Sequence, residues 1–392
     1  MTKNTDPVAL LQTLIRCPSV TPKEAGVLSA LEGMLNPAGF ECTRLPFSAE
    51  NTPDVDNLFA RLGDSGPHLC FAGHVDVVPT GDEALWTYPP FDAQIHDGVL
   101  YGRGACDMKG SVAAFAAAAI DVAADFNGDL PGSISMLITG DEEGPAINGT
   151  VKMLEWMETN NQLPDECLVG EPSCSDKFGD TIKNGRRGSI TFDVVVKGVQ
   201  GHAAYPHLSL NPIPILARLI DQLSRKELDG GTDQFGPSTL AVSTFDVGNP
   251  AANVTPERAS ARFNIRFNTE HSTDSLKALV QKQCDQVTAE MGGEVEVSSF
   301  IGAECFLSNP GPLLTLIQQA LRDETGMEAE LSTSGGTSDA RFIKNYCPVI
   351  EFGPINKTIH QVDERIPVSE LEALMRVYKQ VIRQFLTGQR NT

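Results

Sequence analysis

The sequence has little that would suit a membrane or a nucleic acid. Its longest strongly apolar run, 112–120, is far shorter than the roughly 20 residues that a membrane-spanning helix needs. Lysine and arginine number 30 against 51 acidic residues, a formal net charge of −21. Surfaces that bind nucleic acid or anionic lipid need a basic face. We therefore expect neither a nucleic-acid partner nor a membrane partner.

Cysteine pairs at the spacing of a zinc knuckle are also missing. Nine cysteines, an odd number with no Cys-x-x-Cys pair, predict neither a disulfide framework nor a thiolate metal site. The apolar pattern over 8–15 is that of an amphipathic surface helix, and it lacks the features of a signal peptide. These features predict reduced cysteines and a cytoplasmic location.

The chain does contain several continuous apolar runs that end at turn residues. Runs of this kind fit strands that are buried on both faces, as in a mainly parallel sheet covered by helices. The alanine-rich stretch 109–126 suits such a covering helix. The pattern predicts an α/β fold with a mainly parallel mixed sheet, whose ligands bind beyond the carboxyl ends of the strands. The predicted strands are 68–72, 134–139, 167–169 and 348–352.

The middle of the chain has a different pattern. Between 190 and 300, strand-like and helix-like segments follow each other in the order βαββαβ, which is typical of a small α+β sandwich. At 392 residues the chain is long enough for two domains. We predict an inserted α+β domain at 188–301, and a first domain built from 1–187 and 302–392.

Histidine and acidic residues follow the predicted strands. Zinc sites without sulfur use imidazole nitrogen and carboxylate oxygen. His74 and Asp76 point the same way if the strand continues, so the aspartate could orient the imidazole. On a regular strand, the adjacent Glu142 and Glu143 could not both face one metal, which suggests that one coordinates and the other is a general base. A carboxylate bridging two metals would complete a two-metal hydrolytic site.

Each of these segments is weak when taken alone. A Gly-His dipeptide is usually structural, and 141–143 alone would more often be a solvated turn. Together they predict a metal site more strongly, because each of them follows the end of a predicted strand. Cys106 could be a thiolate ligand, although a small buried residue in a turn is the simpler interpretation. His68, His96 and His271 lack this context, and we expect them to be structural or exposed.

Two longer blocks carry a family resemblance. The segments 73–79 (GHVDVVP) and 101–110 (YGRGACDMKG) resemble the dinuclear zinc hydrolases that include desuccinylases, acetylornithine deacetylase, aminoacylase and glutamate carboxypeptidases. The resemblance covers essentially the whole chain. It implies two zinc ions per subunit, for which cobalt can substitute. The implied ligands are His74 and Glu171 for one ion, Glu143 and His360 for the other, and Asp107 bridging both, with Asp76 orienting His74 and Glu142 transferring protons.

The resemblance also gives the inserted domain a role in dimerisation and as a lid. In this family that domain carries the homodimer interface. The segment 201–206 (GHAAYP) is similar to the one whose histidine reaches the partner subunit's active site, so His202 is expected to stabilise the tetrahedral oxyanion there. The structural alternative for His202 is a hydrogen bond that closes a strand end.

Four later blocks bear on the substrate, namely 183–189, 253–256, 334–342 and 351–356. They are most similar to the desuccinylase branch. They imply hydrolysis of N-succinyl-LL-2,6-diaminopimelate to succinate and LL-2,6-diaminopimelate, a step in lysine and diaminopimelate biosynthesis. For such an anionic N-acyl amino acid, arginines are suitable clamps and glycines let the backbone approach closely. The expected substrate contacts are Arg186, Tyr205, Asn253, Arg266, Gly335, Gly336 and Asn356.

Two other functions stay open. An acetylornithine-type deacetylase would share the metal site and differ in its acyl and side-chain pockets. A catalytically silent binding module should have lost the base, yet Glu142 and all five implied ligands are present. The substitution Glu142→Ala separates an enzyme from such a module.

Overall fold

The structure is a computed structural model that describes residues 5–308 and 311–388. Its contacts divide the chain into two compact units. The first contains the described residues of Met1–Asn184, Ser308–Ser332 and Ser338–Thr392, and the second contains Gly185–Leu307 and Thr333–Thr337. The sequence-based limit of 188–301 left out the short pair β9 (Gly185–Arg186) and β16 (Phe306–Leu307), which the contacts assign to the second unit.

The first unit is built on an eight-stranded mixed sheet. The central strand β3 pairs in parallel with β6 and β7, β7 pairs in parallel with β18, and β1 and β2 add an antiparallel edge. Every residue of β3 and β6 is buried, as expected for strands covered on both faces. This confirms the predicted α/β class. The strand order is β1 (Glu41–Phe47), β2 (Val55–Leu62), β6 (Ser133–Thr139), β3 (His68–His74), β7 (Glu166–Val169), β18 (Val349–Glu351), β8 (Thr181–Lys183) and β17 (Glu330–Ser332).

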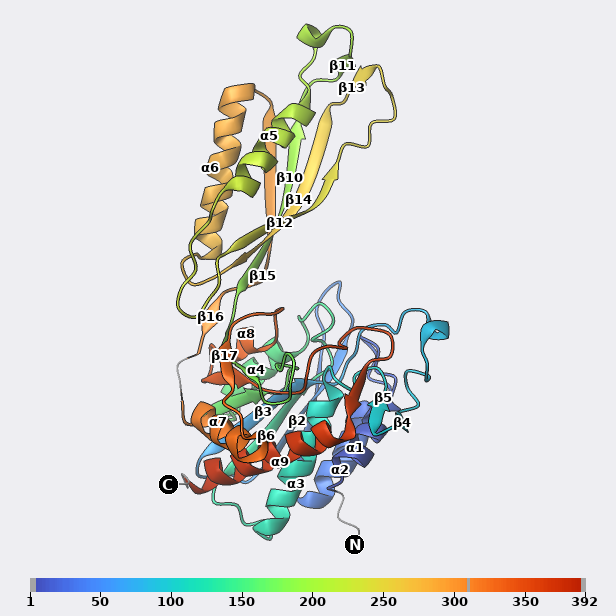
Figure 1. The fold of residues 1–392 in the computed structure, drawn as a ribbon, viewed down its shortest axis with the longest axis vertical. Helices are drawn as coiled ribbons and strands as arrows, with labels where there is room; N and C mark the ends of the chain where they lie inside the picture. Colours follow the sequence, from blue (N-terminus) through green and yellow to red (C-terminus); the bar gives the residue numbers. More distant parts are fainter. Residues whose placement is uncertain (1–4, 309–310, 389–392) are drawn as a thin grey trace. The chain divides into compact units, whose positions relative to one another are not determined.

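Long helices cover one face of this sheet (Figure 1). Helix α3 can be buried on almost every side because its small alanines let neighbouring elements approach closely. Phe71 of β3 stacks on Phe115 of α3 with ring centroids 4.4 Å apart, and Tyr378 of α9 meets both rings edge-on. Helix α4 contacts β6, and α8 contacts β18. The α-helices of the first unit are α1 (Pro7–Ile15), α2 (Val27–Leu35), α3 (Lys109–Asp125), α4 (Thr150–Thr159), α7 (Pro312–Thr325), α8 (Ala340–Ile343) and α9 (Val368–Thr387).

Smaller elements complete the first unit. A three-stranded sheet of β4 (Gln94–His96), β5 (Val99–Tyr101) and β19 (Arg365–Pro367) ties the segment before α3 to the segment before α9. Single helical turns occur at η1 (Asn36–Ala38) and η2 (Glu83–Leu85). Among the described residues, no helix combines the length and the apolar character needed to cross a bilayer.

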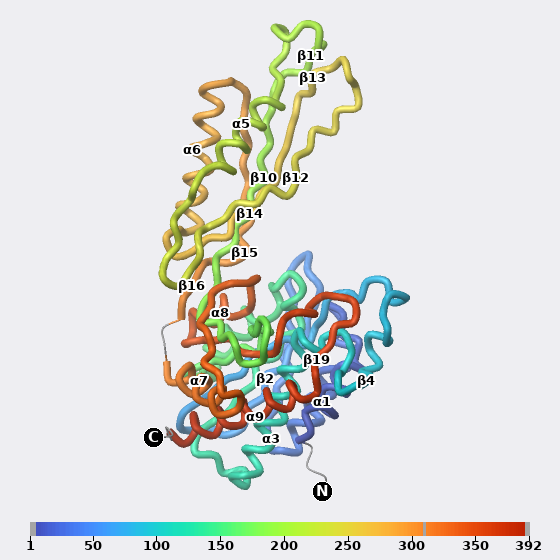
Figure 2. The backbone as a smooth tube through the Cα atoms, viewed as in Figure 1, coloured from blue at the N-terminus to red at the C-terminus, as the bar shows by residue number. Residues whose placement is uncertain are grey.

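The second unit is a four-stranded antiparallel sheet with two helices, and Figure 2 traces β10, β14 and β12 side by side. Its chain order β10, α5, β12, β14, α6, β15 is the predicted βαββαβ pattern. Phe192 and Phe263 stack in its core, 5.3 Å apart. The elements are β12 (Thr239–Asp246), β14 (Arg258–Phe267), β10 (Gly188–Lys197), β15 (Glu294–Ala303), α5 (Pro212–Arg225) and α6 (Thr273–Met291), with β11 (Gly201–His202), β13 (Val254–Thr255) and η3 (Pro206–Leu208).

Candidate metal centre

The acidic and histidine side chains of the first unit meet at one edge of the large sheet. Parallel strands β3, β6 and β7 are neighbours, so the segments that follow their carboxyl ends lie together. Two glycines, Gly73 and Gly170, lie beside them where a side chain would be crowded. A Cβ on Gly73 would lie 2.6 Å from Met108 Cε, and one on Gly170 would lie 2.5 Å from the Phe71 ring. The absence of these side chains lets the helix that follows Asp107 pack close beneath the site.

Five side chains form two donor groups that share one carboxylate. His74, Asp107 and Glu171 make one group, and Asp107, Glu143 and His360 make the other, with the donor atoms in each group within 4.8 Å of one another. Asp107 Oδ1 lies 3.2 Å from His74 Nε2, while its Oδ2 lies 3.4 Å from His360 Nε2. His360 Nε2 is also 2.8 Å from Glu143 Oε1. The two oxygens of Asp107 therefore face different histidines, as a bridging carboxylate would.

The orientation of His74 differs from the sequence-based expectation. Its Nδ1 lies 2.9 Å from the main-chain oxygen of Asp76 and 3.7 Å from the Asp76 carboxylate. A carbonyl can only accept, so Nδ1 donates to it, and Nε2 is the ring nitrogen that faces Asp107 and could bind a metal. The main chain of Asp76 holds the imidazole, because the carboxylate is engaged elsewhere.

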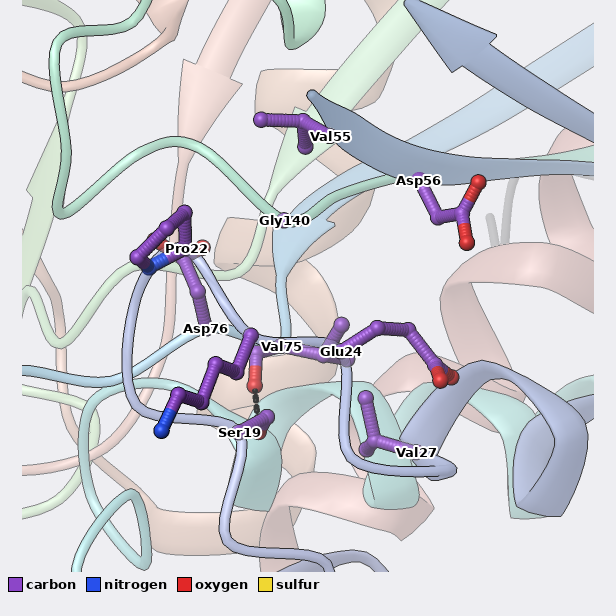
Figure 3. Close-up of a pocket in the computed structure, with 10 residues that line it drawn as sticks. Ser19, Pro22, Glu24, Val27, Val55, Asp56, Val75, Asp76 and Gly140 are labelled. Carbon is purple, nitrogen blue, oxygen red and sulfur yellow. Dashed lines mark hydrogen bonds between the residues drawn. The ribbon is translucent and has the colours of Figure 1, made fainter. Parts of the chain in front are cut away.

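The Asp76 carboxylate supports the loop that carries the two glutamates. It accepts hydrogen bonds from the main-chain N–H groups of Glu142, at 3.3 Å, and Glu143, at 3.0 Å. Beside it lies a cavity of about 10 Å³ (Figure 3), which is room for about one water molecule. Ser19 closes this region by donating a hydrogen bond of 2.5 Å to the Val75 carbonyl. Asp76 is thus a buried support for the loop.

The electrostatics of the site favour the binding of positively charged ions. Burial raises the pKa of Glu171 well above its usual value, and the charges of Asp107 and Glu142 raise it further. Burial lowers the pKa of His74, but its hydrogen bond to Asp107 and the surrounding carboxylates outweigh this and raise that pKa. Burial also raises the pKa of Glu142 to about 8. Crowded carboxylates with two imidazoles and no thiolate fit a pair of divalent ions such as zinc.

A buried ion pair that sequence reasoning missed positions two of these ligands. Glu364 accepts the main-chain N–H groups of Gly104, Cys106 and Asp107 at 2.9–3.0 Å. Arg103 donates to Glu364 at 2.7 Å and to the carbonyl of Gln361, next to His360, at 3.2 Å. The pair fixes the turn before Asp107 and the loop of His360 relative to each other. No sequence signal identified it, because the partners are about 260 positions apart.

Cys106 lies outside the donor groups found among the described residues. Its thiol donates to the Ile355 carbonyl at 2.9 Å, and burial raises its pKa well above the ordinary value, with nearby carboxylates adding to the effect. A protonated thiol is a poor metal ligand. The structure therefore favours the interpretation of Cys106 as a small buried residue in a turn.

Several predicted substrate and catalytic residues lie in the second unit. His202 is exposed, and its Nδ1 accepts the main-chain N–H of Ala204 at 3.1 Å. The neutral imidazole then carries its proton on Nε2, where it can donate. Tyr205 packs near the His202 ring, with centroids 5.6 Å apart. The carbonyl of Asn253 accepts the N–H of Ala203 at 2.9 Å, so it shapes this loop through its main chain.

Arg186 is buried and engaged with the glycine loop. Its Nη1 donates to the carbonyls of Ser334 and Gly336 at 3.4 and 3.2 Å. Gly335 has a φ of +105°, and a Cβ there would lie 2.6 Å from the same Nη1, so only glycine fits. These contacts make Arg186 a support for the loop, and its use as a substrate clamp stays a prediction.

The two remaining predicted contacts are placed differently. Arg266 lies on β14, where burial lowers its pKa and the charge of Arg187 adds to that effect. An arginine stays protonated even so, and a partly buried guanidinium group that feels a second positive charge favours an anionic ligand. Asn356 lies in the first unit, where its main-chain N–H donates to Cys174 at 3.0 Å. Both roles in substrate binding stay predictions.

Fold and site together define a metal-dependent hydrolase with a dinuclear donor set. The sequence matches the model of peptidase family M20/M25/M40 over residues 70–384. The chain belongs to this family. It is 53% identical over 383 residues to the succinyl-diaminopimelate desuccinylase of Rhodospirillum centenum, and 51% identical to that of Dinoroseobacter shibae. The first alignment covers 98% of each chain, and the second covers 97% of this chain and 99% of the other.

Solved structures share the fold at lower identity. The aminopeptidase PepT of Bacillus cereus superposes with a TM-score of 0.80 at 21% identity, over 97% of this chain and 98% of that one. A dinuclear metal-binding peptidase of the M20 family from Bacillus subtilis gives a TM-score of 0.73 at 15% identity, over 98% of each chain. These structures share the fold, while the family match and the desuccinylase relatives confirm the family resemblance inferred from the sequence.

Proposed function

We propose that the chain hydrolyses N-succinyl-LL-2,6-diaminopimelate to succinate and LL-2,6-diaminopimelate, in lysine and diaminopimelate biosynthesis. Relatives that carry the name succinyl-diaminopimelate desuccinylase match it at about half identity over nearly its full length. The observation that carries the proposal is the sharing of Asp107 between two donor groups, beside a glutamate, Glu142, that belongs to neither of them. That arrangement suits hydrolysis of an amide.

Two zinc ions are the proposed cofactors, with cobalt as a substitute. His74 and Glu171 would hold one ion, Glu143 and His360 the other, and Asp107 both. When bound, such ions polarise the scissile carbonyl and lower the pKa of water. The nitrogen and oxygen donors suit either metal, because zinc and cobalt accept imidazole and carboxylate ligands.

Glu142 is the proposed general base. It lies within the group formed with His74 and Glu143, yet it belongs to neither group that contains Asp107. It takes a proton from the attacking water, and then gives that proton to the amine nitrogen as the C–N bond breaks. Burial and the neighbouring charge of Asp339 favour its protonated form, with His74 opposing them. A base whose proton affinity is raised in this way can both accept and return a proton.

The second unit is proposed to supply substrate contacts and the homodimer interface. His202 Nε2–H is an available donor for a developing oxyanion. At the sheet edges, Val242 and Phe245 of β12 and Phe300 of β15 are exposed large apolar side chains. An exposed apolar edge strand invites pairing with another chain. Phe245→Lys should therefore shift the sedimentation coefficient towards the monomer, and an unchanged value would contradict this interface.

The location proposed for the enzyme is the cytoplasm. All nine cysteines are free, and nine thiols in one chain persist as thiols most readily in a reducing compartment. Alkylation of intact cells before lysis would count the thiols. A disulfide-bonded population in the native protein would contradict this location.

The test of function is succinate release from N-succinyl-LL-diaminopimelate beside acetate release from N-acetylornithine. Chelator-stripped protein is assayed with and without added zinc. We expect zinc-dependent turnover of the succinyl substrate only. Preference for the acetyl substrate would be consistent with the proposed metal centre but would overturn the proposed substrate. Inactivity on both substrates would overturn the proposal that the chain is an enzyme.

A further inference from the structure

A fully buried lysine follows the turn that carries Asp107. Lys109 is the first residue of α3, and its Nζ donates to two main-chain carbonyls, those of Leu14 at 3.1 Å and Cys17 at 2.8 Å. In the described part of the chain, no carboxylate oxygen lies within ion-pair distance of this Nζ. Lysine is rarely buried without an acidic partner, because removing a charge from water is costly. Its place beside a candidate metal ligand therefore points to a role in the site.

The acceptors of this lysine belong to the end of helix α1 and the residues just after it. Helix α1 ends at Ile15. The last carbonyls of a helix have no partner within the helix, and its carboxyl end carries partial negative charge, so a cation is favourable there. Lys109 thus joins the beginning of α3 to the end of α1.

The segment that follows α1 is bound in turn to the chain beyond His74. Ser19 Oγ donates to the carbonyl of Val75 at 2.5 Å (Figure 3). The N–H of Val77 donates to the carbonyl of Ser19 at 3.0 Å, and the N–H of Thr21 donates to the carbonyl of Val77 at 3.1 Å. The segment that accepts from Lys109 therefore leads directly into the segment that supports the main chain after His74.

The hydrocarbon part of the lysine packs against the turn that precedes Asp107. A Cβ on Gly104 would lie 3.1 Å from Lys109 Cδ and 2.9 Å from Val77 Cγ1. Gly104 also has a φ of +85°, a conformation that glycine adopts without strain. The turn can therefore lie close to the lysine stem and to Val77 together, so Lys109 contacts the Asp107 side of the site and the His74 side at once.

We propose that Lys109 is a positioning residue of the metal centre, which holds the Asp107 turn against the segment that supports the chain beyond His74. An ammonium group has donors and no acceptor, so it cannot itself bind a metal ion. It acts through Asp107, whose two oxygens face His74 and His360. A shift of that carboxylate would misplace a donor for both ions. The inference rests on the proposed two-metal site and is independent of the acyl group that the enzyme removes.

Cobalt(II) added to the full-length, metal-stripped protein tests the inference, because the visible absorption of cobalt depends on the geometry of its ligands. Lys109→Met keeps a long unbranched side chain and removes the ammonium. We expect the cobalt affinity to fall about 10–100-fold and the absorption band to shift or lose intensity. A folded Lys109→Met protein with unchanged affinity and spectrum would overturn the inference. If the unaltered protein itself binds no cobalt, the proposed two-metal site is wrong.

Two further variants separate positioning from general stability. Lys109→Gln places its nitrogen one bond short of the two carbonyls, and it is judged by the same criteria if Lys109→Met does not fold. Lys379→Met is the matched control, since Lys379 joins α9 to Asp121 at 2.5 Å, roughly three turns further along α3. We expect this control to lower stability and to leave the cobalt affinity within threefold and the spectrum unchanged. An equal change in the control would show a general loosening of α3 and overturn the inference.

Discussion

The ion pair of Arg103 and Glu364 gives the sharpest prediction about how the metal centre is held. Glu364→Gln leaves the size of the side chain almost unchanged. Glutamine has one acceptor oxygen, whereas Glu364 uses both of its oxygens, one for Cys106 and Asp107 and the other for Gly104 and Arg103. Whichever way the amide is turned, its NH₂ group then faces donors. Arg103, only 2% exposed, would also lose its charged partner.

The expected cost follows from that loss. Breaking a buried ion pair by removing one partner costs about 3–5 kcal/mol of stability. Groups that orient metal ligands typically change metal affinity about 10–100-fold when they are mutated. We therefore expect Glu364→Gln to lower the free energy of unfolding of the first unit by about 3–5 kcal/mol and to weaken metal binding by one to two orders of magnitude.

Both quantities can be measured on the same protein. The two tryptophans, Trp86 and Trp156, belong to the first unit, so their fluorescence during urea unfolding reports on that unit. Arg103 lies over the Trp86 ring at 5.2 Å, which places one probe beside the ion pair. Competition with a chromophoric chelator gives the metal affinity.

The control is Glu372→Gln, which removes an exposed carboxylate from α9. A substitution of this kind changes stability by about 0.5 kcal/mol or less. If Glu364→Gln unfolds with the free energy of the control and binds metal within threefold of the unaltered protein, the ion pair does not organise the site. The reasoning that links residues 103 and 364 to Asp107 and His360 would then be refuted.

Three further predictions concern single side chains. Glu142→Gln should reduce turnover by about 10²–10⁴-fold with two metals per subunit retained, and metal loss measured by atomic emission would contradict a purely proton-transferring role. Cys106→Ala should keep the metal content of the unaltered protein, and loss of one metal ion per subunit would show that Cys106 is a thiolate ligand. Burial lowers the pKa of His68 to about 4, so its neutral form contributes stability above pH 6.5 that is lost as the pH falls from 6.5 to 4. Relative to His68→Gln, this loss should reach at most about 3 kcal/mol in urea unfolding, and parallel pH profiles would contradict it.

Local patterns in the sequence determined much of the fold. The apolar runs at 68–72 and 134–139 became β3 and β6, and the alanine-rich stretch became α3, because burial on both faces and helix propensity are properties of neighbouring residues. The same reasoning placed the metal-binding residue types at strand ends. Parallel strands then bring those ends together whatever the distance along the chain.

Tertiary structure alone decided how those residues are held. Contacts over long sequence separations decide which oxygen of Asp107 faces which histidine, and they form the Arg103–Glu364 pair. The packed main chain also decides that the carbonyl of Asp76, and not its carboxylate, meets His74 Nδ1 most closely. The engagement of Arg186 with the carbonyls beside Gly335 has the same origin. Hydrogen bonds are short and directional, so they follow from the packed positions of the main chain and not from the order of residue types.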